Sequence, residues 1–160
     1  MKRMKRILAG LLVAGMMLAL VGCGGSAEEK TVTLRADMTA DMGVPATDTM
    51  ILTAKGDVIQ TLKEVMEIDL AGIDEDLRDV FIEALEEAIV SVAQGIDGIT
   101  CSSNLSGSVY TVEITFDCTK SATVKAAAEK DLLQIEGGAD KLSLKATQSG
   151  LTASGYEVVE

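Results

Sequence analysis

Alternation of apolar and polar residues is the feature that most restricts how this chain can fold. Between positions 108 and 118 apolar side chains occupy every second position, with threonines and acids between them. A period of two is typical of a β-strand that buries one face. The stretches at 31–39 and 58–70 have the same pattern, and 47–54 is a further extended run. These segments predict a sheet with one face against a core.

Short glycine-containing turns separate these runs. Lys55-Gly56-Asp57 joins 47–54 to 58–70, and a turn around Gly107 joins 96–105 to 108–118. Glycine supplies the positive φ that tight hairpin turns require. The sequence therefore predicts two antiparallel hairpins, and the tail 156–159 adds a brief strand.

A long helix is predicted between Asp74, which can cap its N-terminus, and Gly95, which can close it. Its apolar positions recur at helical spacing, and this favours packing on the sheet over recruitment of a partner helix. They are Leu77, Val80, Phe81, Ala84, Leu85, Ala88 and Val92, widened by Ile82, Ile89 and Val90. Shorter helices are expected at 126–135 and from Ser143, which can cap the N-terminus of the last helix, to Gly155. The fold class is thus α+β, an antiparallel sheet built from hairpins and packed against one long helix and a shorter C-terminal helix.

The first 22 residues do not fit this domain. MKRMKR is followed by fifteen uncharged residues at 7–21, the layout of a secretory signal. A permanent membrane helix is the alternative, but about 20 apolar residues are needed to span a bilayer and no basic flank follows. We expect a removed signal at 1–22, a flexible tether at 23–29 and a single domain at 30–160.

The apolar run ends in Leu20-Val21-Gly22-Cys23, which resembles the lipobox of bacterial lipoproteins. The resemblance implies cleavage before Cys23 and attachment of diacylglycerol to its sulfur. The alternative is a chance cysteine after a signal peptide. Because one acyl chain holds a protein only marginally, two or three chains would make a durable anchor.

Removal of the signal changes the charge balance. The whole chain has 14 basic and 25 acidic residues, a net charge of −11, and loss of four basic residues with the signal leaves a net charge near −15. Such a surface repels phosphate backbones and anionic headgroups, which disfavours nucleic-acid binding. The negative charge is compatible with a cationic partner.

Two further cysteines, Cys101 and Cys118, flank the second hairpin. A disulfide is chemically permitted outside the cytoplasm, but the hairpin turn would pair Cys101 with a residue near 110–113. The sequence leaves two readings open, a bridge or two small buried apolar residues.

The sequence lacks the residues that several kinds of catalytic or metal site require. The chain has no histidine, which disfavours the usual catalytic triads and most transition-metal sites. Its densest acidic cluster, around the start of the long helix, lacks the spacing of a calcium loop and is typical of helix capping. That cluster comprises Asp69, Asp74, Glu75, Asp76 and Asp79. We therefore expect no enzyme activity, no metal site and no cofactor.

The order of these parts is similar to that of the YehR-like family of small bacterial lipoproteins. The resemblance depends on Cys23, the turn at Gly56, the sequence QGIDGI at 94–99 and the closing LTASGYEV at 151–158. It implies an α+β domain with no established activity, and it carries over no functional residue except Cys23.

Three functions are compatible with the sequence. The first is a non-catalytic binding or structural lipoprotein, anchored on the outer face of the bacterial cytoplasmic membrane and contacting another envelope component. The second is an accessory that passes a cation or small cationic solute to a transporter. The third, an envelope hydrolase using paired carboxylates, has the least support.

Overall fold

The computed structural model describes residues 28–93, 95–130, 132–133 and 140–159, without the side chains of 89–93. The predicted signal at 1–22, Cys23 and most of the tether lie outside these residues. So do the side chains of Ile89, Val90 and Val92, which the predicted helix stripe includes.

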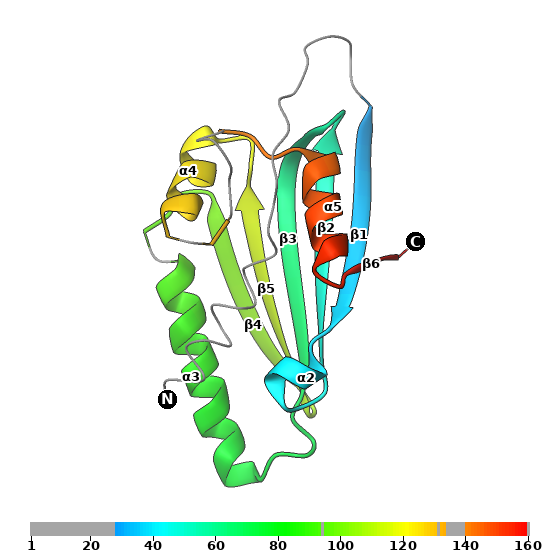
Figure 1. Cartoon of the computed structure of the whole chain (residues 1–160). Coiled ribbons are helices and arrows are strands. Elements are labelled where there is room, and N and C mark those ends of the chain that lie inside the picture. The colour runs from blue at the N-terminus through cyan, green and yellow to red at the C-terminus, as the bar shows by residue number, and fades with distance from the viewer. Residues whose placement is uncertain (1–27, 94, 131, 134–139, 160) are drawn as a thin grey trace.

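One antiparallel sheet forms the centre of the described chain (Figure 1). Its six strands lie in the order β4-β5-β3-β2-β1-β6. Their bounds are β1 Glu29–Asp37, β2 Ala46–Lys55, β3 Val58–Asp69, β4 Ile99–Ser106, β5 Val109–Asp117 and β6 Glu157–Val159. Both predicted hairpins are present, β2–β3 and β4–β5, with positive φ at Gly56 and Gly107.

Four helices of the described chain accompany the sheet: α2 Thr39–Met42, α3 Glu75–Ala93, α4 Ser121–Glu129 and α5 Leu144–Ala153. The α+β prediction is therefore confirmed. The helix expected at 126–135 was misplaced, because α4 begins at Ser121 and ends at Glu129. Leu132 and Leu133, which fall within the expected range, are buried core residues that follow α4. The α3, α4 and α5 helices lie on one side of the sheet (Figure 1).

The core forms on that helix-covered face. Side chains at alternate strand positions are buried there, as the period of two predicted. The most deeply buried strand residues include Leu34, Leu52, Ile59, Leu62, Ile68, Tyr110 and Phe116. Helix α5 closes one side of the core with Leu144 and Leu151, and α4 closes another with Val124 and Ala127.

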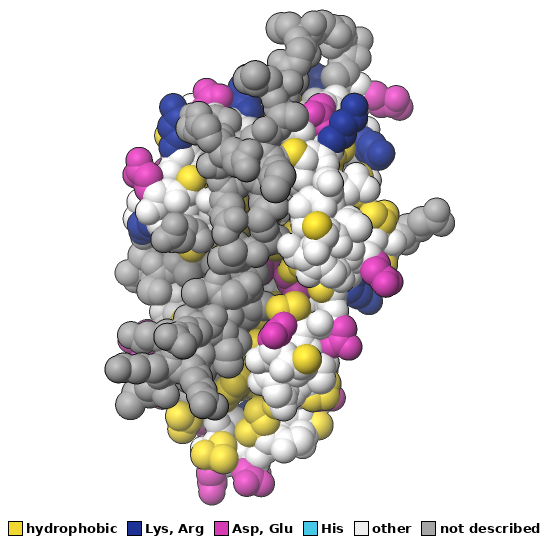
Figure 2. All heavy atoms as spheres, viewed as in Figure 1, with side chains coloured by type: hydrophobic (Ala, Val, Ile, Leu, Met, Phe, Trp, Pro, Cys, Tyr) yellow, Lys and Arg dark blue, Asp and Glu magenta, His cyan; other side chains and the backbone are white. Residues whose placement is uncertain are grey.

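The long helix is less buried than its sequence predicts. Leu85 is buried, and Phe81 and Ile82 pack partly against the core. Leu77 and Val80, however, are 59% and 61% exposed, so the predicted apolar face was wrong at these two positions. The reason is that the N-terminal part of α3 extends past the end of the sheet (Figure 1). Figure 2 shows hydrophobic side chains gathered at that end of the molecule.

The C-terminal helix is held by the tip of the first hairpin. Asp57 accepts hydrogen bonds from Ser143 Oγ at 2.8 Å and from the backbone N–H of Lys145 at 2.9 Å. Ser143 in turn caps α5 by accepting from the N–H of Ala146, as its position in the sequence predicts. The turn that reverses the chain thus also fixes where α5 begins.

Candidate functional site

The two cysteines of the domain lie on the β4–β5 part of the sheet. Cys101 of β4 is opposite Ile114 in the strand register, and Cys118 comes just after β5. Both are free thiols. Burial raises the pKa of the Cys118 thiol to about 12 and also raises the pKa of Cys101. Neither thiol therefore has the lowered pKa of a reactive cysteine.

The face of the sheet opposite the helices is covered by no helix among the described residues. Threonines dominate its central rows, accompanied by a few aliphatic and charged side chains. The rows across β2, β3 and β5 are Thr47–Glu67–Thr111, Thr49–Val65–Glu113 and Ile51–Lys63–Thr115. Most of these side chains are half-buried, since they shelter one another. We call these nine residues the open face.

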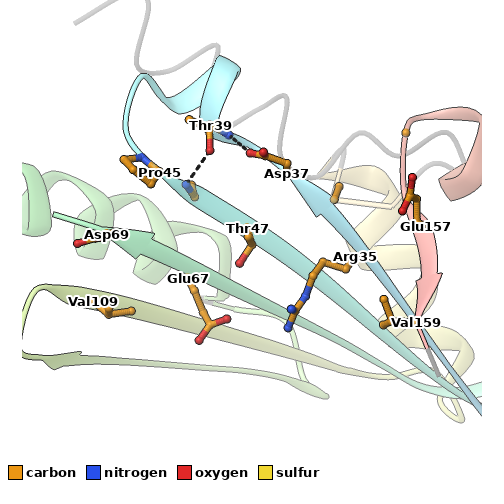
Figure 3. Close-up of a pocket in the computed structure, with 13 residues that line it drawn as sticks. Arg35, Asp37, Thr39, Pro45, Thr47, Glu67, Asp69, Val109, Glu157 and Val159 are labelled. Atoms are coloured by element: carbon orange, nitrogen blue, oxygen red, sulfur yellow. Dashed lines mark hydrogen bonds between the residues drawn. The ribbon is translucent and has the colours of Figure 1, made fainter. Parts of the chain in front are cut away.

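A shallow hollow of about 680 Å3 lies at one end of the open face. Figure 3 shows Arg35, Thr47 and Glu67 pointing into it from three neighbouring strands. Asp37 and Asp69 line its end, and Glu157 of β6 lines its side. The hollow therefore contains four carboxyl groups and one guanidinium, a balance that favours a positively charged partner.

Two of these carboxyls already have partners. Asp69 Oδ1 accepts hydrogen bonds from the Ala71 N–H and from Ser108 Oγ, each at 2.9 Å, and these bonds lower its pKa. Asp37 Oδ1 accepts from the Thr39 N–H at 2.8 Å, and its pKa is likewise lowered by hydrogen bonds from Thr39. Both are therefore ionised at neutral pH and fixed in orientation.

The acidic cluster at the start of α3 does not converge on a site. Asp74, Glu75 and Asp76 are exposed at the helix N-terminus, whereas Asp69 belongs to the hollow. Within the residues that the structure describes, no three side chains of the metal-ligating types are grouped to hold a metal ion.

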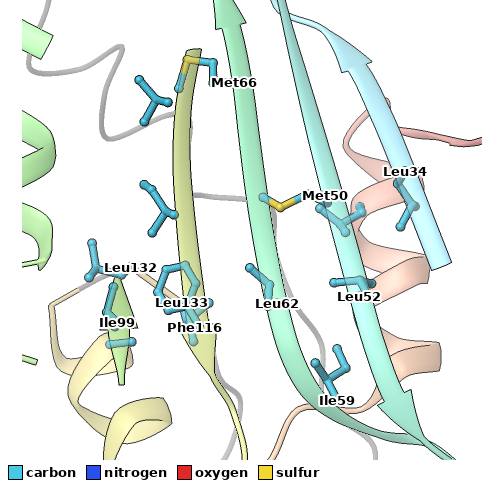
Figure 4. Close-up of a cluster of buried hydrophobic side chains, with 14 of the residues drawn as sticks. Leu34, Met50, Leu52, Ile59, Leu62, Met66, Ile99, Phe116, Leu132 and Leu133 are labelled. Atoms are coloured by element: carbon cyan, nitrogen blue, oxygen red, sulfur yellow. The ribbon is translucent and has the colours of Figure 1, made fainter. Parts of the chain in front are cut away.

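A second polar feature lies on the opposite, helix-covered face. Asp48 of β2 and Glu64 of β3 both point into the core, with exposed fractions of 0% and 2%. Asp48 lies opposite Met66 and Glu64 opposite Met50, so the two acids are diagonal neighbours on adjacent strands. Figure 4 shows these two methionines, Met50 and Met66, among the buried core side chains. We call Asp48 and Glu64 the acid pair.

Burial strongly perturbs the acid pair. It raises the pKa of Asp48 to about 6, despite the lowering effect of a hydrogen bond from Tyr156. Burial, followed by the charge of Asp48, raises the pKa of Glu64 well above its ordinary range. Desolvation without a compensating cation is the physical cause in both residues.

Tyr156 closes this region from the C-terminal side. Although it follows the helix-ending Gly155, its exposed fraction is 6%. Its hydroxyl donates a hydrogen bond to Asp48 Oδ2. The ring is buried because its hydroxyl bonds to Asp48 inside the core. The local sequence around Tyr156 does not reveal this partner.

Sequence reasoning missed the acid pair, although a signal was present. Both acids occupy strand positions whose neighbours two residues away are apolar, namely Met50 for Asp48, and Leu62 and Met66 for Glu64. An acid in the buried register of an alternating strand is unusual, because charge burial is costly.

No helix in the described part of the chain is both long enough and apolar enough to cross a bilayer.

No family model matches the sequence, and no curated protein matches it. The structure is similar to the NMR structure of E. coli YehR, with a TM-score of 0.63 at 13% identity over 84% of this chain and 94% of that one. It is also similar to the NMR structure of a protein from Streptococcus pneumoniae TIGR4, with a TM-score of 0.50 at 16% identity over 89% and 92% of the two chains. The chain therefore has a YehR-like fold, as the order of its parts predicts.

Proposed function

We propose that the protein is a lipid-anchored bacterial surface lipoprotein that acts without catalysis, by contacting another envelope component. Its anchor is the acylated sulfur of Cys23, and its location is the outer face of the cytoplasmic membrane. The tether at 23–29 keeps the domain, with its long helix and its C-terminal helix packed on the sheet, close to the lipid surface.

The observation that carries the contact role is the open face. Its nine residues are four threonines, three charged side chains and the half-exposed aliphatic residues Ile51 and Val65. Such a face offers hydrogen-bonding groups and apolar area at little conformational cost, because strand side chains are already ordered. The acidic hollow beside it selects the partner's charge, so the proposed occupant is a segment carrying lysine or arginine.

The contact role is tested by crosslinking in cells. A photoreactive residue at Thr111, on the open face, is expected to capture one defined envelope protein, whereas the same residue at Thr152, exposed on α5, is not. Glu67→Lys in the hollow should weaken the crosslink, and Glu87→Lys on the exposed side of α3 should leave it intact. Equal labelling from both positions would refute the proposed surface.

The anchor is tested separately. Cys23→Ser should abolish incorporation of a labelled fatty acid and release the protein from the membrane fraction, while Cys101→Ser should change neither. Membrane retention of the Cys23→Ser chain, without label, would refute the lipid anchor.

A second candidate function is that of an accessory that binds a cation or a small cationic solute. The acid pair favours it, because three carboxyl oxygens in the core have no hydrogen-bond partner among the residues that the structure describes. A thermal-shift screen of metal ions, amines and polyamines tests this role, since a ligand that binds only the folded chain raises its melting temperature.

A further inference from the structure

The acid pair leaves an unusual set of atoms unsatisfied. Asp48 Oδ1 and both Glu64 oxygens, Oε1 and Oε2, are buried and accept no hydrogen bond from the described residues. Of the four carboxyl oxygens of the pair, only Asp48 Oδ2 has a side-chain partner in the part of the chain that the structure describes, namely the Tyr156 hydroxyl. Buried polar atoms are nearly always hydrogen-bonded in native proteins, and an orphaned carboxylate is among the costliest exceptions.

No cationic side chain among the described residues forms an ion pair with Asp48 or Glu64. The described ion pairs join Lys63 to Glu113, and Lys120 to Asp97 and Asp117, all away from it. Across the sheet Glu64 lies between Met50 and Ile114, and Asp48 lies between Ala36 and Met66. The other titratable groups that act on the pair are the Tyr156 hydroxyl and, through Glu64, the Cys101 thiol. The pair is therefore an uncompensated acidic site with apolar walls.

The number and type of free oxygens narrow the ligand class. Calcium requires about six to eight oxygen ligands, and magnesium retains several waters. The strand neighbours of the pair present methyl, methylene and thioether groups, which cannot complete either coordination shell. A primary ammonium group carries three N–H donors, which equals the number of unpartnered oxygens.

We infer that Asp48 and Glu64 form an internal binding site for a primary ammonium group attached to a small apolar body. The inference rests on the second proposed function and names its ligand class. In the occupied site the ammonium donates to the three unpartnered oxygens, and its positive charge offsets part of the negative charge of the pair. The apolar part of the ligand lies against the methionine and leucine side chains of the same face.

Tyr156 is the residue that opens the site. It is joined to the rest of the sheet through β6, a strand of three exposed residues, and it follows Gly155, whose φ of +97° few other residues adopt. Short terminal strands open locally at small free-energy cost. Displacement of the Tyr156 ring uncovers Asp48 Oδ2, and its return covers the bound ammonium.

The test is the melting temperature of the purified full chain at pH 8 with methylammonium or tetramethylammonium, at equal ionic strength. Both ions carry one positive charge, but only methylammonium has N–H donors. We expect methylammonium to raise the melting temperature in a saturable way and tetramethylammonium to leave it unchanged. Glu64→Gln should abolish the shift, measured against its own ligand-free value, and Glu83→Gln on the exposed side of α3 should retain it.

Each other outcome is decisive. A shift with calcium or magnesium alone would preserve the solute-binding role and overturn the ammonium site. If no cation produces a shift, both the second function and this inference fail. A methylammonium shift that survives in Glu64→Gln would place the ligand elsewhere and overturn the assignment. Should Glu64→Gln fail to fold, Asp48→Asn takes its place in the same comparison.

Discussion

The Tyr156 hydroxyl donates a hydrogen bond to Asp48 Oδ2 inside the core, across 108 positions of sequence. This contact joins the C-terminal end of the chain to the centre of the sheet. Burial raises the pKa of the Tyr156 hydroxyl, which therefore remains protonated and is the donor. The contact also supplies Asp48 with its only side-chain hydrogen bond among the described residues.

Replacing this tyrosine tests the strength of the contact. Tyr156→Phe keeps the ring but leaves both Asp48 oxygens without a side-chain partner, so we expect a loss of about 1–3 kcal/mol in the free energy of unfolding. Denaturant titration measures it. Tyr110→Phe is the control, because the Tyr110 hydroxyl makes a long hydrogen bond of 3.4 Å to the exposed Glu86. Removing that bond should lower the free energy of unfolding by less. Equal losses would contradict the special role of Tyr156.

The acid pair makes stability depend on pH in a defined direction. Because the pKa of Asp48 rises from 3.8 to about 6 on folding, the folded chain binds a proton more tightly than the unfolded chain. Its stabilising contribution is complete below about pH 4 and is lost as the pH rises through about 6, an effect on the order of 3 kcal/mol. The pKa of Glu64 is also raised, so this residue extends the loss of stability to higher pH.

Glu64→Gln should flatten this dependence. The amide cannot ionise, so the unfolding free energy at pH 8 should exceed that of the unmodified chain by about 1 kcal/mol or more. Denaturant titrations from pH 4 to 9 give the slope, and Glu83→Gln should leave it unchanged. Asp37, Asp69 and Asp117 have lowered pKa values, so their contribution is lost only as the pH falls below about 4. A Glu64→Gln chain with the original slope would contradict the role of the pair.

Gly98 occupies a position that no larger residue fits. Its φ is +87°, and an added Cβ would overlap Thr123 Oγ1, which donates to the Asp97 carbonyl at 2.7 Å. We expect Gly98→Ala to destabilise the chain by about 2–4 kcal/mol, the sum of backbone strain and steric overlap. Gly43→Ala is the matched control, since Gly43 has φ of +73° with no atom within 4 Å of the added Cβ. Its cost should be limited to about 1–2 kcal/mol, measured by thermal unfolding.

The first hairpin tip should control the stability of α5. Asp57→Ala removes two hydrogen bonds to the helix start, and Ser143→Ala removes its N-cap, so each should lower stability by about 1–2 kcal/mol. Because the two side chains bond each other, the double variant should lose less than the sum of the single losses. Amide exchange at Lys145 and Ala146 reports the change directly. Additive losses would show that the contact between the tip and the helix contributes little.

Local patterns predicted much of the fold. The alternation at 108–118 and the turn at Gly56 define strands and hairpins because period and positive φ are local properties. Ser143 was identified as a cap for the same reason. The burial of Tyr156 and the bond from Asp57 to Ser143 depend on residues far apart in sequence, so no local pattern could predict them. The exposed Leu77 and Val80 likewise reflect where the sheet ends, which helical periodicity does not encode.

The site was less predictable than the fold. Glu64 stands in the buried register of β3, and its acidic side chain was an available but unused signal. The position of Asp48 on the adjacent strand, diagonal to Glu64, required the strand register itself. The hollow on the open face combines β1, β2, β3 and β6, whose order in the sheet follows from tertiary structure alone.

The course of β1 gives an anchored molecule a polarity. Glu29, where the predicted tether ends and β1 begins, lies opposite Lys55 at the hairpin tip, whereas Asp37 lies opposite Thr47 at the hollow. Nine strand residues separate these ends by roughly 27 Å. A chain held by lipid at Cys23 would thus have its acidic hollow, here a recess at the far end of β1, on the side of the domain that faces away from the membrane. Soluble or wall-associated partners would reach that recess first, and proteins embedded in the bilayer would meet the hairpin tip and the start of α5.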